Sequence, residues 1–455
     1  MRRRRFLTGL AGAAAGCAAP GGSGTGRPGD PVVLTVLSHY GSEPLKSAFQ
    51  KVLDEWNAGH DRVRVRSTPV RYADLLTTAM VRQAAGQGAD ILHPYTLWAG
   101  QLTRAGVLQP APPGAAALIR HGFTRAAVTA ASVQETLYGY PTEVQTYALY
   151  CNMRLLRAAG VTRPPRTWRE LEHAAYASAR HDGHGNTLVQ GFGLSRTEDA
   201  TVVGQTLALL ASCGGSYLTA DGGRAAIDSP AGRAVVALER RLIERGASSP
   251  GTDLYRAFPS GRVAMAISAG WWTGSLKNAM GPGYHDVRVV PVPGPAAGDR
   301  GTLTTGFLLG VNAKSRHPRA AWDFLRWLNS DEMRGGDGLY TGDGTPAPRP
   351  TGTAPGRDTR LPGVTRMSAL QFSVGSMTGR SRDMRALLGT TGDANLVPFL
   401  DALGYATPEP NGPHAQKAKS LLRKNIEEVW TRQRSVDDAL RTARRQIDHA
   451  LSGDP

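Results

Sequence analysis

The sequence predicts an α/β protein with two domains, and three observations support this prediction. The chain has 455 residues, enough for two hydrophobic cores. Short apolar strands alternate with amphipathic helices through its first third, which is typical of a parallel sheet with right-handed crossovers. A β-rich segment from Val144 to Cys151 begins among polar residues and continues with apolar ones. Such a segment is expected where a strand leaves a cleft and enters a core.

The composition fits a globular protein and argues against a nucleic-acid partner. Charged residues make up 20% of the chain and hydrophobic residues 41%, unlike a disordered sequence. The formal net charge is +16, and the run Arg2–Arg5 contributes four of these charges. The other basic residues are spread over helices and do not form one stripe with interleaved aromatic side chains, as nucleic-acid binding would require.

The N-terminus predicts export and lipidation. Arg3-Arg4-Arg5-Phe6-Leu7 opens an apolar stretch that is too short to span a bilayer, and it resembles a twin-arginine export signal. Ala14-Ala15-Gly16-Cys17 resembles a bacterial lipobox, although Leu is usual where Ala14 stands. We therefore expect an export signal at 1–16, a lipidated Cys17 and a flexible linker to residue 31. A plain secretory signal cleaved elsewhere and export by the general route remain alternatives.

The first third of the chain reads as strands and helices in alternation. We expect a buried strand at Val32–Ser38, followed by a helix opened by Pro44 and ended by Asn57-Ala58-Gly59. A strand at Val63–Arg66 and a helix around Tyr72–Met80 come next. A strand at Ala89–His93 and a helix from Leu97 to Gly106 follow them. Ligands of open α/β sheets bind beyond the carboxyl ends of the strands. The loops His39–Glu43 and Pro94–Trp98 are therefore expected at a cleft.

The rest of the chain continues the alternation. We expect a short helix ending near Gly160, a helix capped by Thr167 with Glu170 three residues on, and a helix at Ala225–Arg245. Next come a strand at Arg262–Ser268 that runs into a loop with Trp271 and Trp272, a strand at Val287–Pro293 and a return crossover at Thr304–Asn312. A helix at Pro318–Asn329, a loop at Gly335–Arg360 and two helices from His414, the second opened by Ser435 with Asp438, complete the chain. None of the expected helices is long enough to cross a membrane.

Several segments resemble motifs of the extracellular solute-binding proteins that feed carbohydrate ABC importers. They are Tyr138-Gly-Tyr-Pro with the strand to Asn152, Pro164-Pro165-Arg166-Thr167-Trp168, Phe258–Ile267 and Ala321–Asn329, in the family order. Cys151 stands where the family usually has an aromatic residue. The resemblance covers nearly all of Val32 to Leu451.

This resemblance implies a two-lobe periplasmic-binding-protein fold of type II. Each lobe would hold a mixed, mostly parallel sheet flanked by helices, with a hinge where the chain crosses between lobes. The expected N-terminal lobe comprises 32–142 and 303–350, and the C-terminal lobe 143–302 and 351–455. The implied function is capture of a sugar or oligosaccharide in the interlobe cleft and its delivery to ABC permease subunits. We expect a monomer without a cofactor, anchored through Cys17 to the outer face of the cytoplasmic membrane.

Aromatic and polar residues at the predicted cleft are the candidate ligand-binding residues. Sugars offer flat apolar faces and hydroxyl groups, so their sites combine aromatic rings with carboxylate and amide groups. A glycine at the return crossover would allow close backbone approach, or it is only a bulge. The candidates are Tyr40, Tyr95, Trp98, Glu143, Gln145, Trp271, Trp272 and Gly306.

The sequence contains no recognisable catalytic or metal-binding motif. It lacks a Gly-x-Ser-x-Gly elbow, a His-Glu-x-x-His motif and a Gly-x-x-x-x-Gly-Lys phosphate loop. His181 and His184 lie in a Gly/Asn-rich stretch without a third ligand nearby, so we interpret them as a solvated loop. Cys151 and Cys213 lie in apolar runs and either pair or stay as buried thiols.

Three other functions remain open. A receptor of the same fold for a phosphorylated polyol or a glycan fragment would use a basic cleft, lined by Arg366 or Arg349. An exported carbohydrate-active enzyme would turn its substrate over. A surface adhesion or signalling protein would not be encoded beside an importer.

Overall fold

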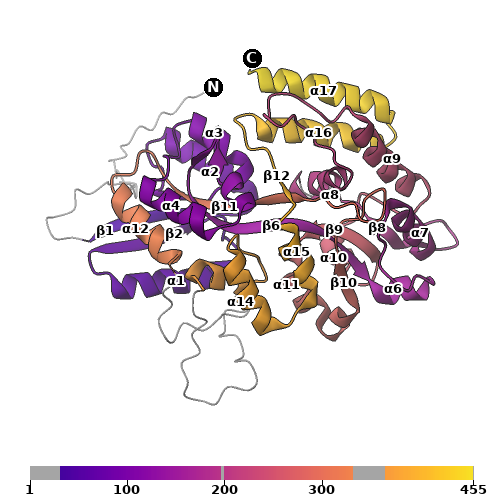
Figure 1. The fold of residues 1–455 in the computed structure, drawn as a ribbon, viewed down its shortest axis with the longest axis horizontal. Helices are drawn as coiled ribbons and strands as arrows, with labels where there is room; N and C mark the ends of the chain where they lie inside the picture. The colour runs from indigo at the N-terminus through magenta and orange to yellow at the C-terminus, as the bar shows by residue number, and fades with distance from the viewer. Residues whose placement is uncertain (1–30, 196–198, 331–363, 454–455) are drawn as a thin grey trace, which may run out of the picture.

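A computed structural model describes residues 31–195, 199–330 and 364–453. Two groups of elements lie side by side, and the long strand β6 (Tyr140–Asn152) runs from one to the other (Figure 1). They share a 10-stranded sheet in the order β2-β1-β3-β11-β6-β9-β8-β7, with β10 paired to β6 and β12 paired to β11.

The first group contains the N-terminal strands. Strand β1 (Val32–Ser38) pairs in parallel with β2 (Val63–Pro69) and β3 (Ile91–Leu92), and β11 (Leu303–Val311) runs antiparallel to β3. Helices on this side are α1 (Leu45–Gly59), α2 (Tyr72–Ala84), a 3-10 turn at Thr96–Trp98, α3 (Ala99–Arg104), α4 (Pro113–Gly122), α5 (Arg125–Ala130) and α12 (Pro318–Leu328), and a small hairpin joins β4 (Ser132–Val133) to β5 (Thr136–Leu137). The apolar face of α1, with Phe49, Leu53 and Trp56, is buried as its helical spacing predicts.

The second group is built on β9 (Val263–Ala269). This strand pairs antiparallel with β6 and parallel with β8 (Thr187–Gly193), while β7 (Arg180–His181) and β10 (Val287–Val290) are antiparallel additions. Its helices are α6 (Met153–Ala158), α7 (Trp168–Ser178), α8 (Asp199–Ser212), α9 (Pro230–Glu244), α10 (Leu254–Ala257), α11 (Trp272–Met280) and a 3-10 turn at Gly281–Asp286. The expected Thr167 cap forms, because Thr167 accepts from the Glu170 amide, and Ser229 caps α9 by accepting from the Gly232 amide.

The C-terminal segments connect the two groups. They comprise α13 (Arg366–Ser373), α14 (Ser381–Thr391), a 3-10 turn at Ala394–Leu396, α15 (Val397–Ala402), β12 (Thr407–Pro408), α16 (Ala415–Trp430) and α17 (Val436–Ser452). In Figure 1, α16 and α17 lie over the second group, and α14 and α15 lie on the opposite side of β6. Ser435 caps α17 by accepting from the Asp438 amide, as the sequence predicts.

The buried apolar residues of the two groups of elements form separate cores. One core gathers residues up to Val144 and again from Leu308 to Leu328, and others begin at Tyr147 and Ala148. Met367 and Leu370 pack into the first core, although they follow residue 351. The exact lobe boundaries at 142/143, 302/303 and 350/351 stay a prediction.

Some expectations about the elements need correction. Helix α9 begins at Pro230 and not at Ala225, because Pro suits the first helical turn and Ser229 caps it. Strand β10 ends at Val290, before the prolines. The expectation of mostly parallel strands fits the first group, where β1 pairs in parallel with β2 and β3, but it is wrong for the second, where most pairs are antiparallel. The expected loop at Gly335–Arg360 lies entirely outside the described residues, and so do the export signal and nearly all of the linker.

Both cysteines of the globular part carry free thiols. Cys151 is fully buried on β6, and Cys213 is partly buried after α8. Burial raises the pKa of both thiols above the usual value for cysteine. Within the described ranges, no helix combines the length and the apolar character needed to cross a membrane.

Candidate functional site

Strand β6 carries the candidate polar residues at the point where it passes from one core to the other. Glu143, Gln145 and Tyr147 alternate along it and so project to one face, as a strand requires. Every residue of the strand is buried, which contrasts with the solvated strand that a polar start would otherwise suggest. A segment after α13 covers it, because Thr378 forms a bridge to Glu143 and the Val144 amide donates to the Met377 carbonyl.

Gln145 connects three parts of the chain. Its side-chain amide donates to Ser376 Oγ at 2.6 Å, and its carbonyl oxygen accepts from the Trp271 backbone amide at 3.0 Å. A glutamine amide has two hydrogens, and among the described residues only Ser376 accepts one of them. The side chain therefore keeps one donor while its oxygen holds the Trp271 backbone.

The adjacent tryptophans have different environments. Trp271 is partly exposed and packs on Tyr255, with ring centroids 5.2 Å apart. Trp272 is 2% exposed and packs on Tyr150 and Phe258 in a core. The expected extended loop is wrong here, because α11 begins at Trp272 and turns the second ring inward.

Three further candidates lie inside the first core and are bound to the C-terminal segments. Tyr40 is 1% exposed and accepts from the side-chain amide of Gln371, and burial raises its pKa well above the usual range. Tyr95 donates to Glu409 at 2.6 Å, and Trp98 donates to Gln416 Oε1 at 2.9 Å.

Gly306 lies against the backbone of the neighbouring crossing strand. A Cβ atom built on it would lie 2.2 Å from the Glu143 carbonyl oxygen, and the β6–β11 register shifts between Gly306 and Leu308. The sequence allowed either a close backbone approach or a bulge at Gly306, and the structure has both. The backbone that approaches Gly306 is that of β6.

Two partly exposed aromatic rings, Phe307 and Tyr72, were not among the candidates named from the sequence. Phe307 is one residue past Gly306, and the His39 imidazole stacks on it with centroids 3.8 Å apart. Tyr72, at the start of α2, stacks on Trp98 at 5.3 Å and meets Phe307 edge-on. The alternation of side chains along β11 could have indicated that Phe307 lies on the same face as other cleft residues. Tyr72 belongs to the apolar face of α2, which predicts a core position.

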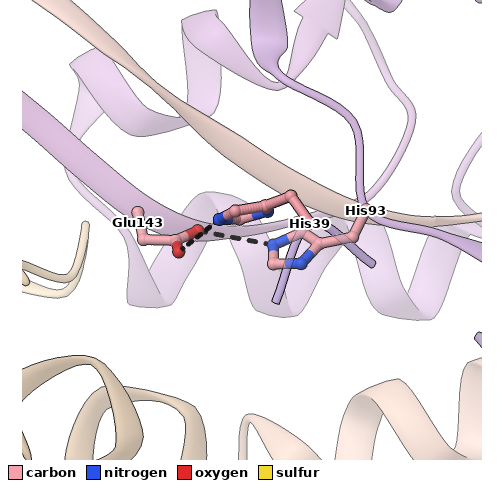
Figure 2. Close-up of side chains that lie close together, drawn as sticks. All are labelled: His39, His93 and Glu143. Carbon is pink, nitrogen blue, oxygen red and sulfur yellow. Dashed lines mark ion pairs between the residues drawn. The ribbon is translucent and has the colours of Figure 1, made fainter. Parts of the chain in front are cut away.

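Two histidines converge on Glu143 (Figure 2). The Nε2 atom of His39 lies 3.2 Å from Glu143 Oε1, and that of His93 lies 3.4 Å from Oε2. Each histidine directly follows a strand, β1 or β3, at the carboxyl end of the sheet. The sequence reading placed both residues there without proposing a role for either.

Burial and the contacts among the three side chains set the electrostatics of this cluster. It lowers the pKa of His93 to about 4, because a charged imidazole is costly in an apolar interior. Burial alone would raise the pKa of Glu143, but the charge and hydrogen bonds of His39 and the hydrogen bond of His93 outweigh it and hold that pKa well below its usual range. Glu143 is thus a buried carboxylate with neutral His93 beside it at pH 7.

The residues considered for a basic cleft or a histidine metal site lie elsewhere. Arg366 is 5% exposed, pairs with Glu55 at 2.8 Å and lies over the Trp327 ring. Arg349 is outside the described residues. His181 and His184 are exposed, and His181 Nε2 lies 3.0 Å from the Gly246 carbonyl.

Comparison with known proteins gives one family match. The family model of the bacterial extracellular solute-binding proteins matches residues 40–335. A probable ABC transporter-binding protein of Deinococcus radiodurans is 24% identical over 205 residues, which are 42% of this chain. The chain spans about half the length of that curated relative, since the match covers 47% of it.

Solved structures share the fold over nearly the whole chain. The cyclic α-maltosyl-1,6-maltose binding protein of Arthrobacter globiformis has 21% identity and a TM-score of 0.73, with 93% of this chain and 100% of that chain covered. The GacH receptor of Streptomyces glaucescens, solved with and without acarbose, has 18% identity, a TM-score of 0.75 and the same coverage. Maltose-bound MalE3 of T. maritima has 18% identity and a TM-score of 0.72, over 92% of this chain and 99% of that one.

Proposed function

This chain belongs to the bacterial extracellular solute-binding proteins, and on that premise we propose that it binds a sugar or oligosaccharide and delivers it to the permease of an ABC importer. The family is extracellular, so the protein is exported, and its members are binding proteins. The proposed lipid anchor is Cys17, which holds the protein at the outer face of the cytoplasmic membrane.

One observation carries the carbohydrate assignment. On the strand that joins the two cores, Gln145 has a side-chain donor to spare among the described residues, and its side-chain oxygen accepts from the backbone amide of Trp271, whose ring is partly exposed. Sugars are recognised by such pairs, because their C–H faces pack on aromatic rings while their hydroxyls exchange hydrogen bonds with amides. The rings of Phe307 and Tyr72, which meet edge-on, add further aromatic groups on the side of the first core.

The proposed mechanism is closure of the two lobes around the sugar. Strands β6 and β11 both pass between the cores, so small backbone rotations in them change the angle between the lobes. A sugar that contacts both lobes favours the closed form by the extra contacts made there. The permease would recognise the spacing of the two lobes in that form.

A calorimetric titration with maltose, maltotetraose, mannobiose and tagatose tests the proposal, since structurally similar proteins bind these sugars. At least one sugar should release heat, and the radius of gyration from X-ray scattering should fall in the same sample. Trp271→Ala should weaken that binding about tenfold or more. Tyr176→Ala, which removes a partly exposed ring on α7, should leave it unchanged. Folded protein that releases no heat with any carbohydrate would contradict the assignment.

A further inference from the structure

We propose that His39, His93 and Glu143 bind a divalent transition-metal ion, and that this ion is zinc. The proposal goes beyond solute binding and does not depend on which solute is bound. It rests on the arrangement of the three side chains, which come from β6 and from the residues that follow β1 and β3 (Figure 2).

The donor atoms are spaced for a single ion. With zinc-to-ligand distances of about 2.0–2.2 Å, two neighbouring tetrahedral ligands lie roughly 3.3 Å apart. In the structure, His39 Nε2 lies 3.2 Å from Glu143 Oε1 and His93 Nε2 lies 3.4 Å from Glu143 Oε2. All three donors lie within 4.8 Å of one another, so the two imidazoles need only a small approach to close the site.

Surrounding groups already orient two of the three ligands. Ser38 Oγ lies 3.1 Å from His93 Nδ1, which leaves Nε2 facing the carboxylate. The Thr142 hydroxyl donates to Glu143 Oε2 at 2.8 Å. Hydrogen bonds of this kind fix the tautomer and the angle of metal ligands in proteins. The Thr142 hydroxyl also lies 2.7 Å from His93 Nε2, so it must turn from that atom when an ion binds.

His39 is the adjustable ligand. Its ring is stacked on Phe307, and its Nδ1 atom is buried without a hydrogen-bond partner among the described residues. Its side chain is 10% exposed, whereas that of His93 is fully buried. The movement that closes the site therefore belongs to His39.

The donor set favours zinc over magnesium and calcium. Two imidazoles and one carboxylate suit zinc, whereas magnesium and calcium take oxygen ligands. Three protein ligands leave a fourth position for water or for an oxygen of a bound solute, as in open zinc sites. The ion would join the ends of β1 and β3 to the strand that enters the other core, and would so stiffen that crossing.

The test uses the full chain without a polyhistidine tag, treated with a chelator and then titrated with zinc chloride in the absence of sugar. We expect one tightly bound zinc per chain by calorimetry and by elemental analysis, a raised melting temperature, and the visible absorption of four-coordinate cobalt when Co²⁺ replaces zinc. His39→Gln should weaken zinc binding by about 100-fold or more, because a direct ligand contributes at least as much as its supporting groups.

Two variants keep the result interpretable. His93→Gln removes a fully buried ligand and can unfold the protein, so the partly exposed His39→Gln, with an unchanged circular dichroism spectrum, carries the conclusion. The double variant His181→Gln, His184→Gln removes two exposed histidines and should bind zinc like the wild type. A wild-type protein without stoichiometric zinc, a His39→Gln protein with unchanged affinity, or loss of zinc in the double variant would each overturn the proposal.

Discussion

Glu239 is a buried carboxyl group on α9, outside the candidate site, and we expect it to make stability depend on pH. It lies on α9 with no exposed surface, and it accepts hydrogen bonds from Thr206 at 2.8 Å and from the Trp430 indole at 3.1 Å. Burial raises the pKa of Glu239 to about 7, although both hydrogen bonds act against the shift. The protonated form satisfies the same partners, since its hydroxyl can donate to Thr206.

We predict that Glu239→Gln stabilises the protein in alkaline solution. The pKa is raised in the folded state, so the protonated carboxyl favours folding below about pH 4.5, and this contribution is lost as the pH rises to about 7. A shift of this size corresponds to roughly 3 kcal/mol. Glutamine keeps the neutral form at every pH. In urea melts, the variant should exceed the wild type by about 2–3 kcal/mol at pH 8 and by much less at pH 5.

An exposed residue of the same helix serves as the control. Glu244 pairs with Arg240 at 2.6 Å near the end of α9, and Glu244→Gln should change stability little at either pH. An equal gain for Glu239→Gln at pH 5 and pH 8 would show that ionisation is not the cause.

At the residue scale, position along a strand was predictable and burial was not. The alternation of β6 correctly put Glu143 and Gln145 on one face, because side-chain direction in a strand is a local property. The convergence of His39 and His93 on Glu143 depends on packing among β1, β3 and β6, which are distant in sequence. A single sequence carries no direct signal for such a contact.

Among the elements, the crossing of β6 and β11 is the most tightly constrained. We predict that Gly306→Ala lowers the free energy of unfolding by about 2–3 kcal/mol, because its Cβ would lie 2.2 Å from a β6 carbonyl oxygen and the backbone must shift. Thermal melts measure the change. Gly389→Ala is the matched control, since no atom beyond the adjacent backbone of its own helix lies within 4 Å of its added Cβ. In that helix, alanine should raise stability by up to about 1 kcal/mol. Equal effects at both positions would contradict the packing argument.

Elements with strong local patterns were predicted well. The expected β1 has the observed bounds, α1 ends as expected and α17 begins after Ser435 as expected, because apolar spacing and caps act within a few residues. Strand direction was predicted less well. Alternation with helices suggested mostly parallel strands, but β6 is flanked by β11 and β9, which both return antiparallel to it. The covering of β6 by Met377 and Thr378 likewise depends on contacts remote in sequence.

For the whole molecule, the proposed anchor predicts where the protein is found. Wild-type protein should stay with the membrane fraction of the native or a related bacterium, whereas Cys17→Ala should appear in the soluble or secreted fraction. Acyl chains on Cys17 supply the membrane affinity, because two or more chains hold a protein stably at a bilayer. Fractionation followed by immunoblotting measures the difference.

A second cysteine provides the control for this anchor. Cys213→Ser changes a partly buried thiol of the globular part and should leave the protein with the membrane. Membrane association of Cys17→Ala, together with an unacylated N-terminal peptide in the mass spectrum of the wild type, would exclude lipidation at Cys17.

The scarcity of accessible thiols makes the globular part convenient for chemical labelling. Cys151 has no exposed surface, and burial raises the pKa of both Cys151 and Cys213, so neither is readily a thiolate at neutral pH. In a version that begins after Cys17, a maleimide dye would react preferentially with a cysteine introduced at an exposed position. A pair of such dyes, one on each side of β6, would turn the protein into an optical sensor without prior removal of its native cysteines.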